Sequence, residues 1–144
     1  MNERRIIVET IKRFDIRDKS INIFIGEEFE RYGLKYGVQQ NYADFCFVAQ
    51  EDNKILGVIT GKALYDEVHI ENLIVAEAYR NKGLGSKLIE TVEDNFKDKG
   101  YNFISLTTFE FQAPEFYKKL GFSIDFVHEN KNPKLNKYFL IKRF

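Results

Sequence analysis

The chain has 144 residues, enough for one domain with its own hydrophobic core. Hydrophobic residues make up 44% of the chain, including 14 Phe and 8 Tyr, so a packed interior is readily supplied. Lys plus Arg equals Asp plus Glu at 22 each, which argues against nucleic-acid or membrane binding driven by charge. Charged residues interrupt the N-terminus and no apolar run could span a bilayer, so we expect no signal peptide and a cytoplasmic protein.

The first part of the chain predicts one strand and one helix. Residues 5–11 are expected to form a first strand. Residues 18–36 predict a helix that ends near Gly33 or Gly37, because apolar side chains recur at helical spacing. These side chains are Ile21, Ile25, Phe29 and Tyr32.

The remaining elements alternate between strands and helices. Strands are expected at residues 45–50, 55–64, 67–75, 103–107, 122–127 and 138–142, and helices at 83–99 and 113–120. Residues 51–54 form a polar hairpin turn, and Gly100 stands just past the longer helix. This order predicts a single α/β domain over residues 1–144, with a mixed sheet of about six or seven strands and helices on both faces.

Cys46 is the only cysteine, so no disulfide can form within the chain. Its neighbours Phe45 and Phe47 are apolar and the segment has strand character. We therefore expect Cys46 to be a buried strand residue rather than a nucleophile.

The loop at residues 80–86 carries the strongest chemical signal in the sequence. It joins an apolar strand to a helix, so several N–H groups without helical partners point toward one place. The helix dipole and the cations Arg80 and Lys82 favour an anion there, and Gly83 and Gly85 let the backbone approach it. The pattern predicts a pyrophosphate site, and a glycine-rich helix start without a ligand is the alternative.

Spacing excludes two familiar phosphate loops. A P-loop needs four residues between its first glycine and a Gly-Lys-Ser/Thr end, and no such stretch occurs. A dinucleotide fingerprint needs a third glycine where Leu88 stands, and the strand before it should open the fold, whereas this strand lies in the middle of the chain. What remains is Arg-x-x-Gly-x-Gly directly after the strand that ends Leu73-Ile74-Val75.

A second segment, residues 112–122, predicts a short helix that carries Phe116 and Tyr117. Pro114 suits its first turn and Gly121 suits a left-handed cap. The two motifs, in this order and at this separation, resemble the signatures of the GNAT N-acetyltransferase superfamily. The resemblance is close over roughly residues 55–122 and general elsewhere.

The resemblance implies direct acyl transfer from acetyl-CoA, as co-substrate and without a metal, to a primary amine. It also implies a sheet whose strands splay at the CoA site, where one strand edge pairs with the pantetheine arm. Gln112 stands where many members have an asparagine that contacts the arm. The implied CoA-binding residues are Leu73, Ile74, Val75, Arg80, Asn81, Lys82, Gly83, Leu84, Gly85, Ser86, Gln112 and Phe116.

Three residues are candidates for catalysis. Tyr117 occupies the position of a family tyrosine near the CoA sulfur, where a phenol could protonate the leaving thiolate; the alternative is a packing role. Glu71 and His69 are candidate general bases, expected on one strand face together with Leu73 and Val75. A solvated carboxylate and a half-buried imidazole are the alternatives.

The acceptor stays open at the level of sequence. A small-molecule amine and a protein amine both fit, and the chain is compatible with a homodimer. Two other functions remain: an acyl-CoA-binding sensor or regulatory module without turnover, and an unrelated α/β nucleotide-binding domain. We expect no nucleic-acid or membrane partner.

Overall fold

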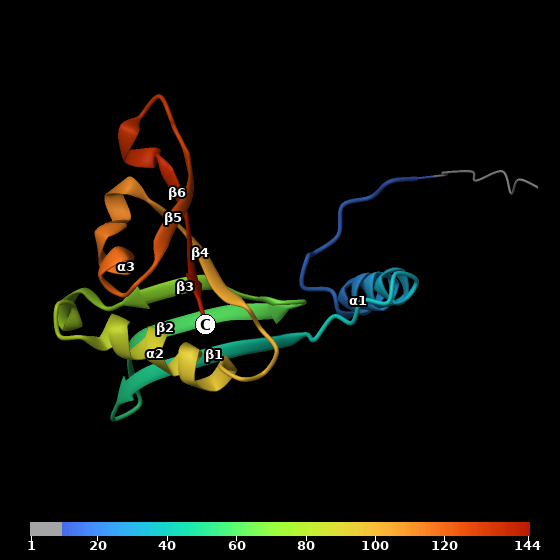
Figure 1. The fold of residues 1–144 in the computed structure, drawn as a ribbon, viewed down its shortest axis with the longest axis horizontal. Helices are drawn as coiled ribbons and strands as arrows, with labels where there is room; N and C mark the ends of the chain where they lie inside the picture. The colour runs from blue at the N-terminus through green and yellow to red at the C-terminus, as the bar shows by residue number, and fades with distance from the viewer. Residues whose placement is uncertain (1–9) are drawn as a thin grey trace, which may run out of the picture. The chain divides into compact units, whose positions relative to one another are not determined.

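The computed structural model describes residues 10–144, which fall into two compact units that divide after Gln39. The first unit contains helix α1 (Lys19–Leu34), as the apolar spacing predicts (Figure 1). Asp18 caps this helix, since its side chain accepts from the N–H groups of Ser20 and Ile21. Gly37 follows the helix with a φ of +69°. In the strand expected at residues 5–11, residues 5–9 lie outside the described part, and Thr10 and Ile11 have no regular structure.

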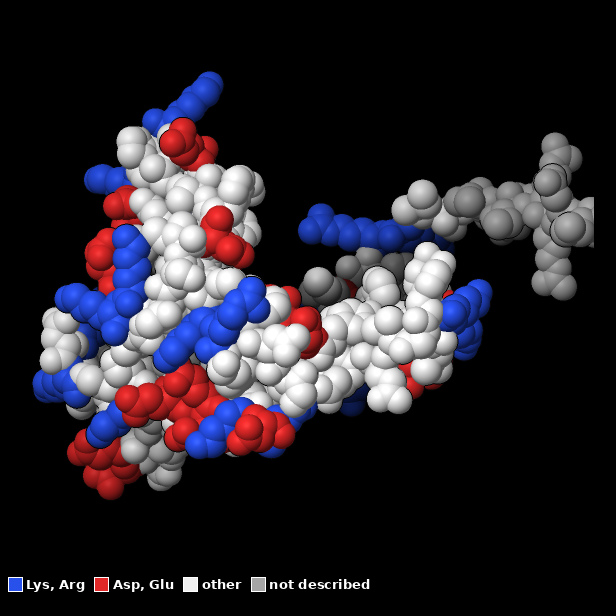
Figure 2. All heavy atoms as spheres, viewed as in Figure 1, with Lys and Arg blue, Asp and Glu red and all other residues white. Residues whose placement is uncertain are grey.

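The second unit is built on a six-stranded mixed sheet with the order β1-β2-β3-β4-β6-β5. All its pairs are antiparallel except β3 with β4. The strands are β1 (Ala43–Glu51), β2 (Lys54–Leu64), β3 (Glu67–Val75), β4 (Phe103–Phe109), β5 (Ser123–His128) and β6 (Lys137–Arg143). Figure 2 shows Lys, Arg, Asp and Glu side chains interspersed over the visible face of this unit, without one large field of a single sign.

The β1–β2 hairpin confirms the turn expected at residues 51–54. Asp52 and Asn53 have φ values of +48° and +67°, as a two-residue type I′ turn requires. Side chains alternate along β1, so Phe45 and Phe47 pack into the core and Cys46 points the other way. The expectation that Cys46 is buried is therefore wrong: the thiol is exposed.

Helix α2 (Leu84–Phe96) covers β1, β2 and β3 with one apolar face (yellow in Figure 1). Its buried side chains are Leu88, Ile89, Val92 and Phe96. The helix ends three residues before the predicted boundary, because Lys97 has a ψ of 145° and Asp98 a φ of +60°. Gly100, predicted just past the helix, has a φ of +91°.

Helix α3 (Glu115–Lys119) follows β4 and packs on the same core through Tyr117 and the adjacent Leu120. Gly121 takes the predicted left-handed conformation, with a φ of +95°. The chain then enters β5, which pairs with β6 at the edge of the sheet.

Strands β3 and β4 separate after a short paired stretch (Figure 1). They pair only over Glu67–His69 with residues 103–105, and then both run on to their C-terminal ends without pairing with each other. The splayed sheet that the resemblance implies is thus present in the structure. The gap leaves backbone groups of β3 without partners in β4.

Candidate functional site

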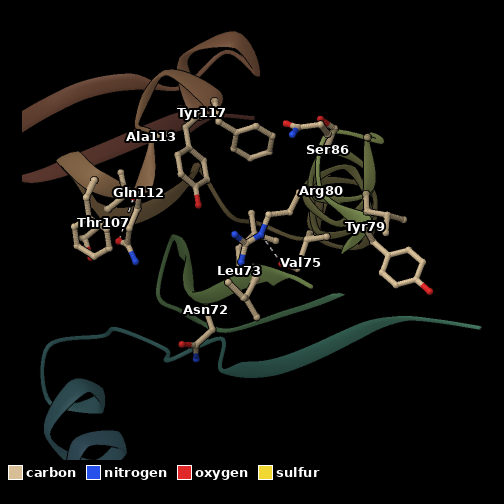
Figure 3. Close-up of a pocket in the computed structure, with 18 of the residues that line it drawn as sticks. Asn72, Leu73, Val75, Tyr79, Arg80, Ser86, Thr107, Gln112, Ala113 and Tyr117 are labelled. Atoms are coloured by element: carbon tan, nitrogen blue, oxygen red, sulfur yellow. Dashed lines mark hydrogen bonds between the residues drawn. The ribbon is translucent and has the colours of Figure 1, made fainter. Parts of the chain in front are cut away.

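A cleft of about 720 Å³ opens in the gap between β3 and β4 (Figure 3). Five segments contribute to it: the end of β3, the loop after it, the start of α2, the end of β4 and α3. The lining residues are 71–75, 79–81, 83–86, 107, 108, 111–113, 116 and 117. Of the site residues predicted from sequence, only His69 and Lys82 do not line this cleft.

The start of α2 forms one end of the cleft. Gly83 is its N-cap, with a φ of +84° that favours glycine and with no side-chain cap. The first backbone bond of the helix runs from the N–H of Lys87 to the carbonyl of Gly83, at 3.1 Å. The N–H groups of Leu84, Gly85 and Ser86 therefore lack helical partners, and all three residues line the cleft. This is the arrangement that suits a phosphate oxygen.

Positive charge adjoins this helix start. Arg80 lines the cleft, and Asn81 beside it has a φ of +62°, which turns the chain toward α2. The Nζ atoms of Lys82 and Lys54 lie 5.5 and 5.3 Å from the ring centroid of Tyr79, which also lines the cleft. The cations are thus concentrated at the end where the N–H groups converge.

Packing against α3 is a second reason for a glycine at position 85, and the sequence alone did not reveal it. A Cβ atom there would lie 3.0 Å from Cζ of Phe116 in α3. Absence of a side chain at Gly85 therefore lets the ring of Phe116 lie against the first turn of α2, in addition to leaving the backbone open. A Cβ at Gly83, in contrast, would meet no heavy atom within 4 Å.

The edge of β3 presents backbone groups to the cleft. The N–H of Ala76 donates to the carbonyl of Leu56 in β2 at 2.8 Å. Because backbone groups alternate in direction along a strand, those of Val75 and Leu73 point away from β2. Leu73 and Val75 consequently direct their N–H and C=O groups into the gap. Ile74 turns its own toward β2, where its carbonyl oxygen lies against Gly57. Of the three residues predicted for backbone contacts, two face the gap.

Tyr117 points its hydroxyl into the cleft, toward the space between Gln112 and Arg80 (Figure 3). Its ring packs edge-on against Phe116 and Phe122, with centroids 5.0 and 5.9 Å away. Burial raises the pKa of the Tyr117 phenol above its ordinary value of 10.0. The phenol therefore keeps its proton at neutral pH and can donate it.

Gln112 lines the cleft beside the end of β4. Its Oε1 atom accepts from the backbone N–H of Phe109 at 3.1 Å, which closes the short turn between β4 and α3. The side-chain NH₂ group is left as the polar group of Gln112 that can serve the cleft.

A β-bulge in β3 decides where the two candidate bases point. The register moves from Thr60 opposite Asn72 to Gly61 opposite Ile70, so Glu71 is the extra residue. Glu71 shares a face with His69, and its carboxylate lies 3.8 Å from Nζ of Lys62, the residue opposite His69. The expectation that Leu73 and Val75 share this face is wrong, because both pack against the core on the opposite side.

Several lining residues were not predicted from the sequence: Asn72, Tyr79, Thr107, Thr108, Phe111 and Ala113. The expected separation of β3 and β4 could have predicted some of them, since residues at the unpaired end of β4 border the gap. Phe111 lines the cleft and is 61% exposed, so it lies on the open side of the cleft. Ala113 has a φ of +60°, which turns the chain from β4 into α3.

Neither a metal cluster nor a membrane helix occurs in the described part of the chain. Within residues 10–144, no three His, Cys, Asp or Glu side chains come together as a metal site would require. No helix in that range has the length and apolar character needed to cross a bilayer.

Comparison with known proteins identifies the class of this chain. Residues 12–122 match the family model described as the Acetyltransferase (GNAT) family, which is most of the chain. The chain belongs to this family.

Curated relatives carry acetyltransferase names. N-alpha-acetyltransferase 30 of Schizosaccharomyces pombe is 30% identical over 68% of this chain and 69% of its own length. Blasticidin-S acetyltransferase of Streptomyces morookaense is 27% identical over 67% and 71%. The "Probable N-acetyltransferase camello" of Xenopus tropicalis is 34% identical over 54% of this chain, which spans only 38% of that longer protein.

Solved structures share the fold of this chain. An acetyltransferase from Bacillus cereus superposes with a TM-score of 0.75 at 31% identity, covering 92% of this chain and 98% of the other. An acetyltransferase from Bacillus anthracis, solved in complex with acetyl coenzyme A, has a TM-score of 0.62 at 25% identity, with 70% and 62% covered.

Proposed function

We propose that the chain transfers an acetyl group from acetyl-CoA to a primary amine, with residues 1–144 acting as a single acetyltransferase domain. The observation that carries this proposal is the parting of β3 and β4, which exposes a strand edge directly beside an uncapped helix start. The family match supports the single domain, because it runs across the division after Gln39.

The residues of the cleft suit acetyl-CoA. A pyrophosphate would be held by the N–H groups of Leu84, Gly85 and Ser86, with Arg80 and Lys82 supplying positive charge. The amide groups of a pantetheine arm would find free backbone partners at Leu73 and Val75. When bound, acetyl-CoA supplies an activated acetyl thioester.

This chain's own side chains would provide the proton chemistry. The Tyr117 phenol, protonated at neutral pH, would donate to the leaving sulfur from its place in the cleft. An attacking amine has to be neutral, so a base is needed on the acceptor side. Glu71, which lines the cleft, and His69, which shares its face, are the two candidates.

The acceptor is proposed as a primary amine of a small molecule or of a protein. The relatives named for blasticidin-S and for N-alpha acetylation support these two classes equally. A cytoplasmic location belongs to the proposal, since a lone exposed thiol at Cys46 suits a reducing compartment. We also propose a homodimer, because β5 is an edge strand with the exposed apolar side chains Ile124 and Phe126.

The other function to be tested is an acyl-CoA-binding sensor or regulatory module. It would use the same helix start and strand edge, and it would have no need of the Tyr117 hydroxyl in the cleft. Incubation with acetyl-CoA and a panel of amines, amino acids, polyamines, aminoglycosides and peptides should release CoA with at least one acceptor. Tight CoA binding without release from any acceptor would favour the sensor.

A further inference from the structure

Glu67, Ser105 and His69 form a hydrogen-bonded row across β3 and β4. The Ser105 hydroxyl donates to Oε1 of Glu67, and Nδ1 of His69 lies 2.7 Å from Ser105 Oγ. The same Nδ1 lies 3.8 Å from Oε1 of Glu67. Ser105 is only 8% exposed, so its hydroxyl is held within the sheet, while the two end groups remain half-exposed.

The row fixes which imidazole nitrogen carries a proton. An ionised carboxylate can only accept hydrogen bonds, so the single hydroxyl proton of Ser105 is used in the hydrogen bond to Glu67. Ser105 Oγ can then only accept from His69, and Nδ1 has to carry the proton. The Nε2 atom of a neutral His69 is left as a free acceptor.

The row stands where the cleft begins. His69 and Ser105 are the last paired residues before β3 and β4 separate. On the same face lies Glu71, which lines the cleft. The charged groups on the strands beside His69 are Glu67 and Glu71 on β3, Lys62 opposite it on β2, and, further along the sheet, Arg143 of β6, which lies over the ring of Phe103, the residue opposite Glu67.

We propose that Glu67 and Ser105 are positioning residues that hold His69 with Nε2 free to take a proton from the acceptor ammonium. This inference rests on the proposed acetyl transfer. The N–H bond of the ammonium breaks as an Nε2–H bond forms, which leaves a neutral amine and an imidazolium. The amine lone pair then attacks the thioester carbon and the C–S bond breaks. The leaving sulfur takes the Tyr117 proton, the nitrogen gives its second proton to the resulting phenolate, and the imidazolium passes its own extra proton to water.

The tautomer of His69 tests the row without any substrate. The chain has two histidines, so the ring ¹⁵N signals of His69 and His128 are readily told apart by His128→Gln. At about pH 8, where an ordinary imidazole is neutral, His69 should carry its proton on Nδ1. Ser105→Ala should move the proton toward Nε2, and Ser105→Thr should restore it to Nδ1. A proton on Nε2 in the natural protein, or an unchanged tautomer in Ser105→Ala, would overturn the proposal.

Kinetics test the catalytic consequence. Ser105→Ala should lower kcat/KM at neutral pH about tenfold, part of what a general base contributes, while CoA affinity stays unchanged. The loss should shrink at high pH, where the amine loses its proton unaided, and Ser105→Thr should recover the rate. Ser123→Ala is the matched control, since that exposed hydroxyl donates to the carbonyl of Ile141, away from the row.

The tautomer and kinetic measurements distinguish a failure of the row from a failure of the proposed function. A natural protein that transfers acetyl groups, with a Ser105→Ala rate equal to that of Ser123→Ala at every pH, would overturn the role of the row. A natural protein without transfer to any amine would overturn the proposed function, and the tautomer measurement would still decide whether the row exists.

Discussion

Nε of Arg80 donates a hydrogen bond to the carbonyl oxygen of Val75, at 2.9 Å. This bond ties the loop after β3 back to the strand edge and holds the guanidinium beside Val75 in the cleft (Figure 3). It also uses the Val75 carbonyl, so the free groups at this edge are both backbone groups of Leu73 and the N–H of Val75. Arg80 thus has both a positioning role and a charge to offer.

Arg80→Gln should weaken CoA binding about tenfold or more, since it removes a charge-assisted contact to an anion. Arg80→Lys keeps the charge without the fixed fork of donors, so its CoA affinity should lie between those of the natural protein and Arg80→Gln. Isothermal titration with CoA measures both. Lys97→Gln is the control, because Lys97 follows the far end of α2, where it pairs with Asp94. Equal affinities for Arg80→Gln and Lys97→Gln would contradict the site.

Gly85→Ala should weaken CoA binding by displacing Phe116, since its Cβ would lie 3.0 Å from that ring. Phe116→Leu in the same chain removes the ring and should recover part of the affinity. Non-additive effects in this double-mutant cycle would report the contact. Additive effects of the two changes would show that the contact has no influence on binding.

Tyr117→Phe should leave CoA affinity nearly unchanged and lower turnover by ~10²–10⁴-fold, the usual range for general acid catalysis. The affinity is measured by titration and the turnover by CoA release. A fall of less than about threefold would reduce Tyr117 to a packing role.

The same variant should change the alkaline stability of the protein. Burial raises the pKa of Tyr117 in the folded state, so the folded chain retains a proton that the unfolded chain loses. The stabilisation is complete below about pH 10 and is lost as pH rises through the folded pKa. Denaturant unfolding at rising pH should therefore show a shallower alkaline decline for Tyr117→Phe. Tyr101, whose pKa is raised by burial, keeps its contribution in both chains.

Gly61→Ala should destabilise the second unit by about 1–3 kcal/mol, as overpacking usually does. Gly61 faces the bulge of β3, where a Cβ would collide with the carbonyl oxygen of His69 and the ring of Phe45. Gly26→Ala in α1 is the control, because a Cβ there meets nothing within 4 Å. Denaturant unfolding compares the two. A Gly61→Ala chain as stable as the Gly26→Ala chain would show that β3 has room to shift.

The sequence predicted the fold and one end of the cleft well. Glu67–Val75 was predicted with both its bounds, Gly100 lies just past the end of α2 as predicted, and Gly121 takes the predicted left-handed conformation. These signals are local: strand alternation, helical spacing and the special freedom of glycine.

What the sequence missed depends on contacts between distant segments. The bulge at Glu71 lies beside Gly61 of the neighbouring strand β2, which the carbonyl oxygen of His69 approaches closely, and it puts Leu73 and Val75 on the face opposite to the one expected. The row from Glu67 to His69 needs Ser105, 36 residues away from His69 in the chain. Neither follows from periodicity within one strand.

Amide hydrogen exchange with and without acetyl-CoA tests the central claim most directly. Acetyl-CoA should protect the N–H groups of Leu73 and Val75 on β3, together with those of Leu84, Gly85 and Ser86 at the start of α2. These groups lack backbone partners in the free protein, so protection there reports the ligand itself. Unchanged exchange at both places with saturating acetyl-CoA, or equal protection by ATP or NAD, would contradict an acetyl-CoA site between β3 and β4.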